Sequence, residues 1–276
     1  MKIFRKASEL EPNLVSIKDK GQSIGLVLTM GNLHDGHLSL IREAQLHNEF
    51  VICSIFINPT QFNNENDFNS YPKTIDEDIS KLENIGCNVL FLPEAQEIYP
   101  KGLVKKKIVN NFRNILCDKF RPGHFDGVTT VVDLFFNMIK PTNSYFGEKD
   151  FQQVKIIQDL VKINHHNIKI IQCPSVRDKT GMSLSSRNSK FSNDQLKIFN
   201  VLGNKIKEHI NLLTQNEINN LDQLKIEFLQ NNINKIDYLE IRNENNLEIT
   251  KNYSEARLFI ALYIGEIRII DNFKLY

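Results

Sequence analysis

Two histidines near the start of the chain lie where an apolar run gives way to an amphipathic stretch. Residues 30–37 read Met-Gly-Asn-Leu-His-Asp-Gly-His and follow the apolar run Ile24–Leu28. At a strand-to-helix turn, backbone N–H groups and the helix dipole favour anions such as phosphate. Glycines there let a bulky ligand approach the main chain. The pattern favours nucleotide handling by His34 and His37, although a helix cap, surface positions or metal ligation are alternatives; the glutamate of a metalloprotease helix is missing.

Two amides follow the next strand-like run, in Asn58-Pro-Thr-Gln61-Phe62. An amide both donates and accepts hydrogen bonds, which suits a ligand that carries hydroxyls and a carboxylate. Taken alone, the segment is explained better by an Asn-Pro turn followed by a surface glutamine.

A third cluster reads Gly147-Glu-Lys149-Asp150-Phe-Gln-Gln153. Gly147 allows a tight turn, Lys149 offers a mobile positive charge to a phosphate, and Asp150 can accept from a ribose. Gln153 lies one helical turn further on, on the same side as Asp150. A capped helix with charges in its first turn gives the same pattern.

Residues 181–188 read Gly-Met-Ser-Leu-Ser-Ser-Arg-Asn. The hydroxyls of Ser185 and Ser186 and the guanidinium of Arg187, on a flexible segment, can close over a polyphosphate. The alternative is a disordered serine-rich linker, which the interleaved apolar residues disfavour. Arg121-Pro-Gly-His124 is a fourth, weaker candidate, for which the alternative is a simple turn with its histidine on the surface.

The clusters together contain no Ser-His-Asp or Cys-His nucleophile, no Walker A loop and no zinc cluster. Histidines, one lysine, one arginine, serines and amides suit electrostatic stabilisation of a transferring phosphate and the positioning of substrates.

The elements that must position these residues alternate over the first 175 residues. Such alternation predicts a parallel sheet with helices on both faces, and ligands bind outside the carboxyl ends of its strands. Thr74-x-x-Glu77 predicts a capping box for one of the helices. The predicted strands are Ile24–Leu28, Phe50–Ile57, Val89–Leu92, Ser144–Phe146 and Ile168–Gln172, and the predicted helices are Leu38–His47, Thr74 to Gly86, Val128–Ile139 and Asp150–Ile163.

From about Ser175 the pattern changes to a smaller α+β domain behind a polar hinge, Arg177–Asn188. We therefore predict domains at residues 1–175 and 176–276. In the second, helices are predicted at Asp194–Leu213 and Leu221–Leu229, and strands at Lys235–Ile241, Arg257–Ile264 and Ile267–Ile270.

Composition narrows the class of partner. The 276 residues are 41% hydrophobic, and 34 basic and 33 acidic side chains give a net charge of +1, so nothing favours a nucleic-acid groove or an anionic membrane. A small ligand is the default partner. Cys53, Cys87, Cys117 and Cys173 form no C-x-x-C pair and predict buried thiols in a reducing compartment. With no apolar run of 18 residues and no leader pattern, we expect a cytoplasmic protein.

Five motifs in order resemble the pantothenate synthetases, the AMP-forming pantoate–β-alanine ligases of the His-x-Gly-His nucleotidyltransferase superfamily. The His-x-Gly-His loop alone is shared with many nucleotidyltransferases and class I tRNA synthetases, whereas the other four motifs are more specific. The motifs are Thr29-Met-Gly-Asn-Leu-His-Asp-Gly-His-Leu, Phe56-Ile-Asn-Pro-Thr-Gln-Phe, Arg121-Pro-Gly-His-Phe-Asp-Gly-Val, Phe146-Gly-Glu-Lys-Asp-Phe-Gln-Gln and Ser185-Ser-Arg-Asn.

The resemblance implies a two-step reaction. The pantoate carboxylate attacks the α-phosphate of MgATP and releases pyrophosphate, and the β-alanine amine then attacks the pantoyl-adenylate, giving pantothenate and AMP. It also implies an α/β fold, with a Rossmann-like parallel sheet in the N-terminal domain and a smaller α+β lid, in a cytoplasmic homodimer. ATP with Mg²⁺ is then a substrate, without a tightly bound organic cofactor, nucleic acid or membrane.

Carried over position by position, His34 and His37 contact the ATP phosphates, with His37 the proton donor, and Met30 lines the site through its backbone. Gln61 and Gln153 hold pantoate, and Gln61 with Asn58 borders β-alanine. His34, His37 and Lys149 are the implied catalytic residues. The remaining implied ATP contacts are Gly147, Lys149 at the phosphates, Asp150 at the ribose, Val176 near adenine, and Ser185, Ser186 and Arg187 over the phosphates.

Three positions depart from the family pattern: Leu28 replaces a usual proline, Asn32 a common alanine and Leu184 a usual methionine. The acidic run 76–78 either helps to hold Mg²⁺ or is a helix start that favours negative charge, so no protein metal ligand is predicted. Two rival functions remain: another nucleotidyltransferase with a different acceptor, and a non-catalytic nucleotide-binding module. Retention of His37 and Lys149 disfavours the second.

Overall fold

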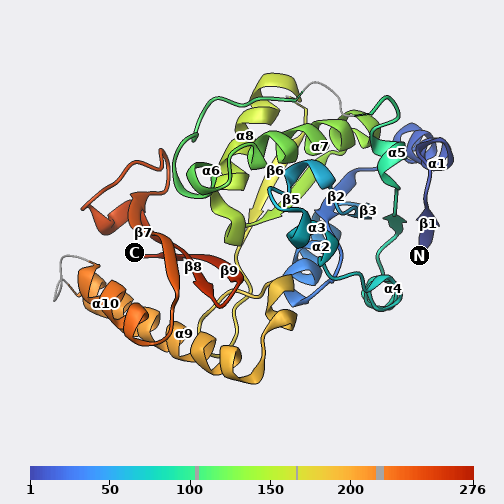
Figure 1. Cartoon of the computed structure of the whole chain (residues 1–276). Coiled ribbons are helices and arrows are strands. Elements are labelled where there is room, and N and C mark those ends of the chain that lie inside the picture. The colour runs from blue at the N-terminus through green and yellow to red at the C-terminus, as the bar shows by residue number, and fades with distance from the viewer. Residues whose placement is uncertain (103–105, 166, 216–220) are drawn as a thin grey trace. The chain divides into compact units, whose positions relative to one another are not determined.

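A six-stranded sheet, parallel at every pairing, organises the larger part of the molecule, in the order β1-β4-β3-β2-β5-β6 (Figure 1). Its central strands are short apolar runs whose residues are buried on both faces, as parallel strands between helices require. The strands are β1 (Lys2–Phe4), β2 (Ile24–Thr29), β3 (Phe50–Ile55), β4 (Val89–Phe91), β5 (Asn143–Gly147) and β6 (Lys169–Cys173).

The computed structural model describes residues 1–102, 106–165, 167–215 and 221–276. These residues form two compact units. Unit 1 is Met1–Arg113, Arg121–Glu148 and Gln152–Pro174, and unit 2 is Asn114–Phe120, Lys149–Phe151 and Ser175–Tyr276. The helices are α1 (Ala7–Asp19), α2 (Asp35–His47), α3 (Glu65–Asn69), α4 (Ile75–Asn84), α5 (Ala95–Ile98), α6 (Leu116–Phe120), α7 (His124–Ile139), α8 (Phe151–Asn164), α9 (Asn193–Thr214) and α10 (Asp222–Gln230), and the short 3-10 turns are η1 (Pro59–Gln61), η2 (Glu148–Asp150), η3 (Ser186–Lys190) and η4 (Tyr253–Glu255).

Helices cover both faces of the parallel sheet, as the sequence predicts. Leu90 of β4 packs in a buried cluster with Ile41 of α2 and Leu82 of α4. Its neighbour Phe91 points the other way and meets Phe135 of α7, with ring centroids 6.1 Å apart. Successive strand residues face opposite sides of a sheet, so α2 and α7 lie on opposite faces (Figure 1).

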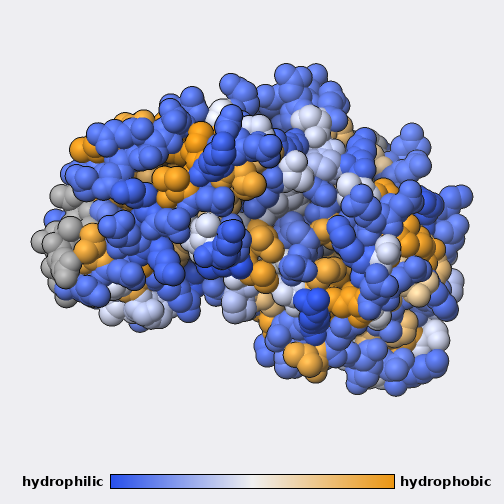
Figure 2. Space-filling model, turned by 90° about the horizontal axis from the view of Figure 1, so that it is seen from below, coloured by the Kyte–Doolittle hydropathy of each residue, from blue (hydrophilic) through white to orange (hydrophobic). Residues whose placement is uncertain are grey.

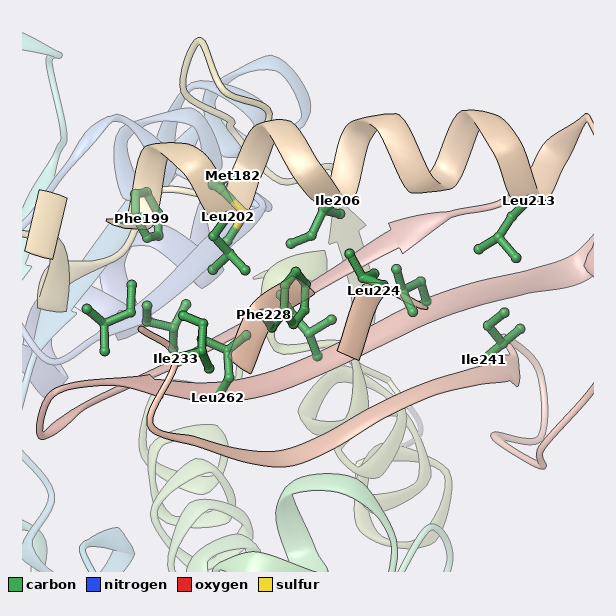
Figure 3. Packing of buried hydrophobic residues seen from close by; sticks show 14 of the residues in the cluster. Met182, Phe199, Leu202, Ile206, Leu213, Leu224, Phe228, Ile233, Ile241 and Leu262 are labelled. Carbon is green, nitrogen blue, oxygen red and sulfur yellow. The ribbon is translucent and has the colours of Figure 1, made fainter. Parts of the chain in front are cut away.

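Unit 2 is built on a separate antiparallel sheet of β7 (Lys235–Asn243), β8 (Ala256–Ile264) and β9 (Ile267–Lys274). One face of this sheet and the apolar stripes of α9 and α10 form one core, in which Phe199, Phe228 and Leu262 are at most 1% exposed (Figure 3). The predicted α/β class, with a parallel sheet and a smaller α+β part, is confirmed.

Several boundaries differ from the prediction for local reasons. Helix α2 begins three residues before the predicted Leu38 because His34 caps it, and α7 begins at His124 rather than Val128. The predicted capping box at Thr74 is wrong: Thr74 is the N-cap of α4 without a side-chain cap, and its hydroxyl donates to Asn32 Oδ1 (3.5 Å). Elements β1 and α1 were not predicted.

Exposed apolar side chains, such as Leu46 and Ile249, are present among the polar ones at the surface. Figure 2 shows hydrophilic side chains over most of one face, with apolar residues in smaller groups between them, which is ordinary for a folded domain. In the part of the chain that the structure describes, no helix combines the length and apolar character needed to cross a membrane. All four cysteines are buried and outside any disulfide, as predicted.

Candidate active site

Strand β2 marks the point where the strand order of the parallel sheet reverses. From β2 the chain continues to β3 and β4 on one side, and later to β5 and β6 on the other. Ligands of such sheets bind outside the carboxyl ends of the strands at this point. Residues 30–37 follow β2, residues 58–61 follow β3, and β5 ends at Gly147. The fold therefore brings the starts of these three predicted segments to one edge of the sheet.

Both histidines of the first segment bind the backbone through Nδ1. Nδ1 of His34 accepts from the Gly36 N–H (3.1 Å), and Nδ1 of His37 accepts from the His34 N–H (3.4 Å), which together cap α2. The ring centroids lie 4.1 Å apart. A ring nitrogen that accepts carries no proton, so this hydrogen bonding assigns the proton of each neutral imidazole to Nε2. Capping and donation to an anion are thus compatible in the same residues.

A buried carboxylate shapes the loop before His34. The loop turns through positive φ at Gly31 (82°) and Asn32 (50°). Asp78 of α4, 0% exposed, accepts from the N–H groups of Asn32 (2.9 Å) and Leu33 (2.7 Å). Within the acidic run 76–78, Asp78 therefore uses both carboxylate oxygens to hold the backbone of this loop. Among the described residues, no group of three His, Cys, Asp or Glu side chains could hold a metal ion.

The Asn58–Gln61 segment is held by its first amide. Asn58, 1% exposed, accepts from the Tyr99 hydroxyl (2.7 Å) and donates to Gln61 Oε1 (3.0 Å). Nε2 of Gln61 in turn lies 3.2 Å from Met30 Sδ. The structure thus brings Gln61 to the loop after β2. Asn58 caps the η1 turn, in agreement with the Asn-Pro turn that the sequence indicates, and it also orients Gln61.

His124 contradicts the expectation of a surface histidine. It is only 7% exposed, and its Nδ1 lies 2.7 Å from the Gln61 carbonyl oxygen, to which Arg121 also donates (3.4 Å). Arg121 Nη1 lies 3.1 Å from Nε2 of the same ring. Arg121, just before α7, and His124, its first residue, therefore support the Gln61 backbone. The Pro-Gly pair does form the turn that the sequence indicates, with Pro122 exposed, but the turn leads directly into α7 and His124 is buried.

The segment after β5 passes from one unit to the other. Gly147 ends β5 in unit 1, and Gln153 is a half-buried residue of α8 in the same unit. Lys149 and Asp150 belong to unit 2, where Nζ lies 3.5 Å from Asp150 Oδ2. The lysine side chain is 20% exposed. It therefore keeps access to solvent, while the Asp150 carboxylate partly neutralises its positive charge.

The polar segment of unit 2 is a hydrogen-bonded hairpin. The Leu184 N–H donates to the Val176 carbonyl (2.9 Å), and the Asp178 N–H donates to the Met182 carbonyl (2.8 Å). Beyond it, Ser185 Oγ accepts from the Arg187 N–H (3.2 Å) and caps η3. The segment expected as a flexible hinge is therefore folded in this structure, and its closure over a nucleotide stays a prediction.

Known proteins resemble the chain over nearly its whole length. The family model for pantoate-beta-alanine ligase matches residues 2–274. A pantothenate synthetase of Francisella tularensis subsp. novicida is 44% identical over 259 residues, 92% of this chain and 90% of that protein. One of Acetivibrio thermocellus is 38% identical over 277 residues, 99% of this chain and 98% of that protein.

Solved structures agree with this likeness. A Francisella tularensis pantoate-beta-alanine ligase, solved in complex with beta-gamma ATP and β-alanine, has 39% identity and a TM-score of 0.85, over 100% of this chain and 98% of that one. A pantothenate synthetase of Thermus thermophilus has 31% identity and a TM-score of 0.86, over 100% of both chains. The chain therefore belongs to the pantoate–β-alanine ligase family and joins pantoate to β-alanine at the expense of ATP in pantothenate biosynthesis.

Proposed function

We propose that residues at the N-terminus of α2 catalyse the first step, the adenylation of pantoate. The pantoate carboxylate attacks the α-phosphate of ATP, pyrophosphate leaves, and a pantoyl-adenylate forms. Nε2–H of His34 and His37 would donate to the phosphates, with His37 the proton donor, beside the α2 dipole and the Met30 backbone. The observation that carries this proposal is the engagement of both Nδ1 atoms with backbone N–H groups.

Amide side chains would bind the two substrates that are joined, pantoate and β-alanine. Gln61 and Gln153 would hold pantoate, and Gln61 would border β-alanine, whose amine attacks the acyl carbonyl and displaces AMP. Asn58 is buried and bonded to Gln61, so it would act on β-alanine mainly through that side chain. The Francisella tularensis relative solved with β-alanine supports a β-alanine site in this family.

Further residues from the segment after β5 and from the 176–187 segment would complete the nucleotide site. Lys149 supplies charge at the phosphates, Asp150 binds the ribose, and Gly147 lets the nucleotide approach the backbone. Mg²⁺ would arrive as part of MgATP and neutralise phosphate charge there, and no protein ligand for it is proposed. Val176 would pack near adenine, and Ser185, Ser186 and Arg187 would close on the phosphates.

We also propose that residues 1–175 bind nucleotide and pantoate and that residues 176–276 act as a lid. A cytoplasmic homodimer is proposed from the family resemblance. Light scattering of the purified protein would test the dimer, and a monomer mass would contradict it.

The reaction is tested by substrate omission. Purified protein is expected to form AMP and pyrophosphate from ATP only with pantoate, and pantothenate only when β-alanine is added. Pyrophosphate release without pantoate would contradict the adenylation step and favour a different nucleotidyltransfer.

Lys149→Ala tests the proposed site. Loss of a preorganised charge at the phosphates is expected to slow pantoyl-adenylate formation about 10²–10³-fold. Rapid-quench measurement of the first turnover isolates that step. A wild-type rate would remove Lys149 from the mechanism while leaving the overall reaction intact.

A further inference from the structure

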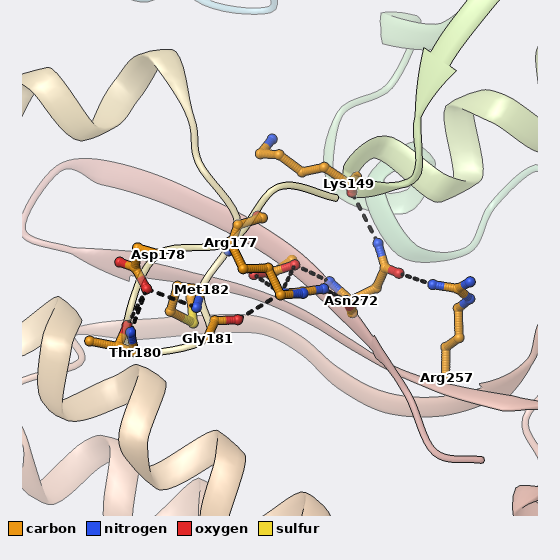
Figure 4. Close-up of polar contacts among 10 residues, drawn as sticks. Lys149, Arg177, Asp178, Thr180, Gly181, Met182, Arg257 and Asn272 are labelled. Carbon is orange, nitrogen blue, oxygen red and sulfur yellow. Dashed lines mark hydrogen bonds and ion pairs between the residues drawn. The ribbon is translucent and has the colours of Figure 1, made fainter. Parts of the chain in front are cut away.

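Two adjacent buried polar residues of β9, Asp271 and Asn272, are 2% and 1% exposed. Neighbouring residues of a strand face opposite sides of its sheet, so the two side chains reach different partners. Figure 4 shows the contacts that run from this point toward the 177–182 hairpin on one side and toward Lys149 on the other.

Asp271 holds the base of the hairpin. Its carboxylate accepts from Arg177 (3.1 Å) and from the Ser183 N–H (2.7 Å). Arg177 also donates to the carbonyls of Asn272 (2.6 Å) and Gly181 (2.8 Å), and its guanidinium lies 4.4 Å from the Phe273 ring centroid. Both strands of the hairpin are therefore tied to β9 immediately before the Ser185–Arg187 run.

Asn272 holds the backbone that carries Lys149. Its Nδ2 donates to the Lys149 carbonyl (3.1 Å), and its Oδ1 accepts from Arg257 Nη1 (2.8 Å). Arg257 is 2% exposed and lies 4.3 Å from the ring centroid of Phe151, two residues after Lys149. The amide orientation is thus fixed by a buried donor, which leaves its N–H directed at the lysine backbone.

We propose that Asp271 and Asn272 are positioning residues for adenylation, Asn272 for Lys149 and Asp271 for the hairpin that leads to Arg187. One strand would then set both proposed phosphate contacts of unit 2 in register. The inference rests on the phosphate roles proposed above for Lys149 and Arg187. A misplacement of about 1 Å in such groups costs about 10²-fold in rate.

Asn272→Asp is the sharpest test, because aspartate keeps the size and the acceptor for Arg257 and loses the N–H donor to Lys149. We expect adenylate formation to slow about 10–100-fold, with KM for pantoate within about threefold of wild type. In a Lys149→Ala background the same substitution should slow the reaction less than about threefold, because its effect acts through that lysine.

Asp271→Asn tests the other half of the proposal, namely that Asp271 acts through Arg187 and not through Lys149. It should slow adenylation in the wild-type and Lys149→Ala backgrounds alike, and have little further effect in an Arg187→Ala background. Phe228→Leu, in the apolar core of the same unit, is the stability control and should leave the rate unchanged. Urea unfolding checks that every variant is folded, and Asn272→Ser replaces Asn272→Asp if the latter does not fold.

If Asn272→Asp and Asp271→Asn each slow adenylation by the same factor in the Lys149→Ala background and in the Arg187→Ala background, the positioning roles are overturned in favour of general destabilisation. An equal loss of rate in Phe228→Leu would have the same meaning. A wild-type rate in Asn272→Asp beside a slow Lys149→Ala would overturn the role of Asn272 alone. A wild-type rate in Lys149→Ala would instead overturn the phosphate role of that lysine, and the inference about Asn272 with it.

Discussion

Each imidazole at the start of α2 has a structural role through one nitrogen and a proposed chemical role through the other. Nδ1 of His34 and of His37 accepts a backbone N–H, and Nε2 is the donor proposed for the phosphates. The helix cap therefore sets the tautomer that the proposed donation to phosphate requires. The two roles can be separated by a residue that has only one of them.

His34→Asn makes this separation. The asparagine oxygen replaces Nδ1 as a cap, while the Nε2 donor is lost. The free energy of unfolding should stay within about 0.5 kcal/mol of wild type, whereas His34→Ala should lose about 1 kcal/mol. Both variants should slow adenylation by about 10²-fold. Urea unfolding and rapid-quench assays measure the two effects, and a wild-type rate in His34→Asn would reduce His34 to a cap.

At the scale of elements, the site depends on contacts between segments distant in sequence. Helix α4 holds the loop after β2 through Asp78, and α7 holds the η1 turn through His124. Gly127 lets α7 approach that turn, since a Cβ there would lie 2.3 Å from the Thr60 carbonyl oxygen. Each of these contacts joins a helix to a loop or turn that follows a strand.

Asp78→Asn should loosen the loop before His34. The amide keeps one acceptor oxygen but turns an N–H toward a backbone N–H, so one buried donor is left unsatisfied. The free energy of unfolding should fall by about 1–3 kcal/mol, and KM for ATP should rise. Asp76→Asn, in the exposed part of the same helical turn, is the control and should change stability by less than about 0.5 kcal/mol. Equal effects of the two substitutions would contradict the role of Asp78.

Gly127→Ala should push the η1 turn away from α7. We expect a loss of about 1–3 kcal/mol in the free energy of unfolding, and a higher KM for pantoate because Gln61 moves with the turn. Val132→Ala, elsewhere on α7, should lower stability without raising that KM. Steady-state kinetics of both variants would show the difference, and an unchanged KM for pantoate in Gly127→Ala would contradict it.

At the scale of the whole molecule, the buried thiols make the free energy of unfolding depend on pH in the alkaline range. Burial raises the pKa of the Cys87 thiol to about 11 and of the Cys173 thiol to about 12. Burial also raises the pKa of Cys53 well above its ordinary value. The folded chain keeps these protons at a pH where the unfolded chain releases them. The stability they give is complete below about pH 8.5–9 and is lost as pH rises toward 11–12.

The free energy of unfolding should therefore fall between pH 9 and 11, with Cys87 contributing about 1.4 kcal/mol per pH unit. Urea unfolding at pH 8, 9 and 10 measures this slope. Cys87→Ala should reduce it, and a slope unchanged by that substitution would show that other groups cause the loss. Native thiols should also resist iodoacetamide at pH 8, because a protonated buried thiol is a poor nucleophile.

The sequence by itself determined the parallel sheet, the presence of a smaller α+β part and the segments that follow the strands. These follow from local patterns: apolar runs of strand length, helical periodicity, and glycines or charges at the ends of runs. The polar clusters were recognisable for the same reason, because each lies within one short stretch of chain. His34 and His37 illustrate this, since three residues of spacing bring their rings to 4.1 Å.

Only the tertiary structure decided what holds those clusters. The contacts of Asp78 with residues 32–33 span 46 and 45 residues, that of His124 with Gln61 spans 63, and that of Asn272 with Lys149 spans 123. No local period records such pairs. From the sequence, Asp78 belonged to an acidic run that suited either Mg²⁺ or a helix start, and His124 to a weak candidate motif or a surface turn. Their roles come from burial: a carboxylate or imidazole removed from water must find a partner, and the fold supplies the backbone of the site.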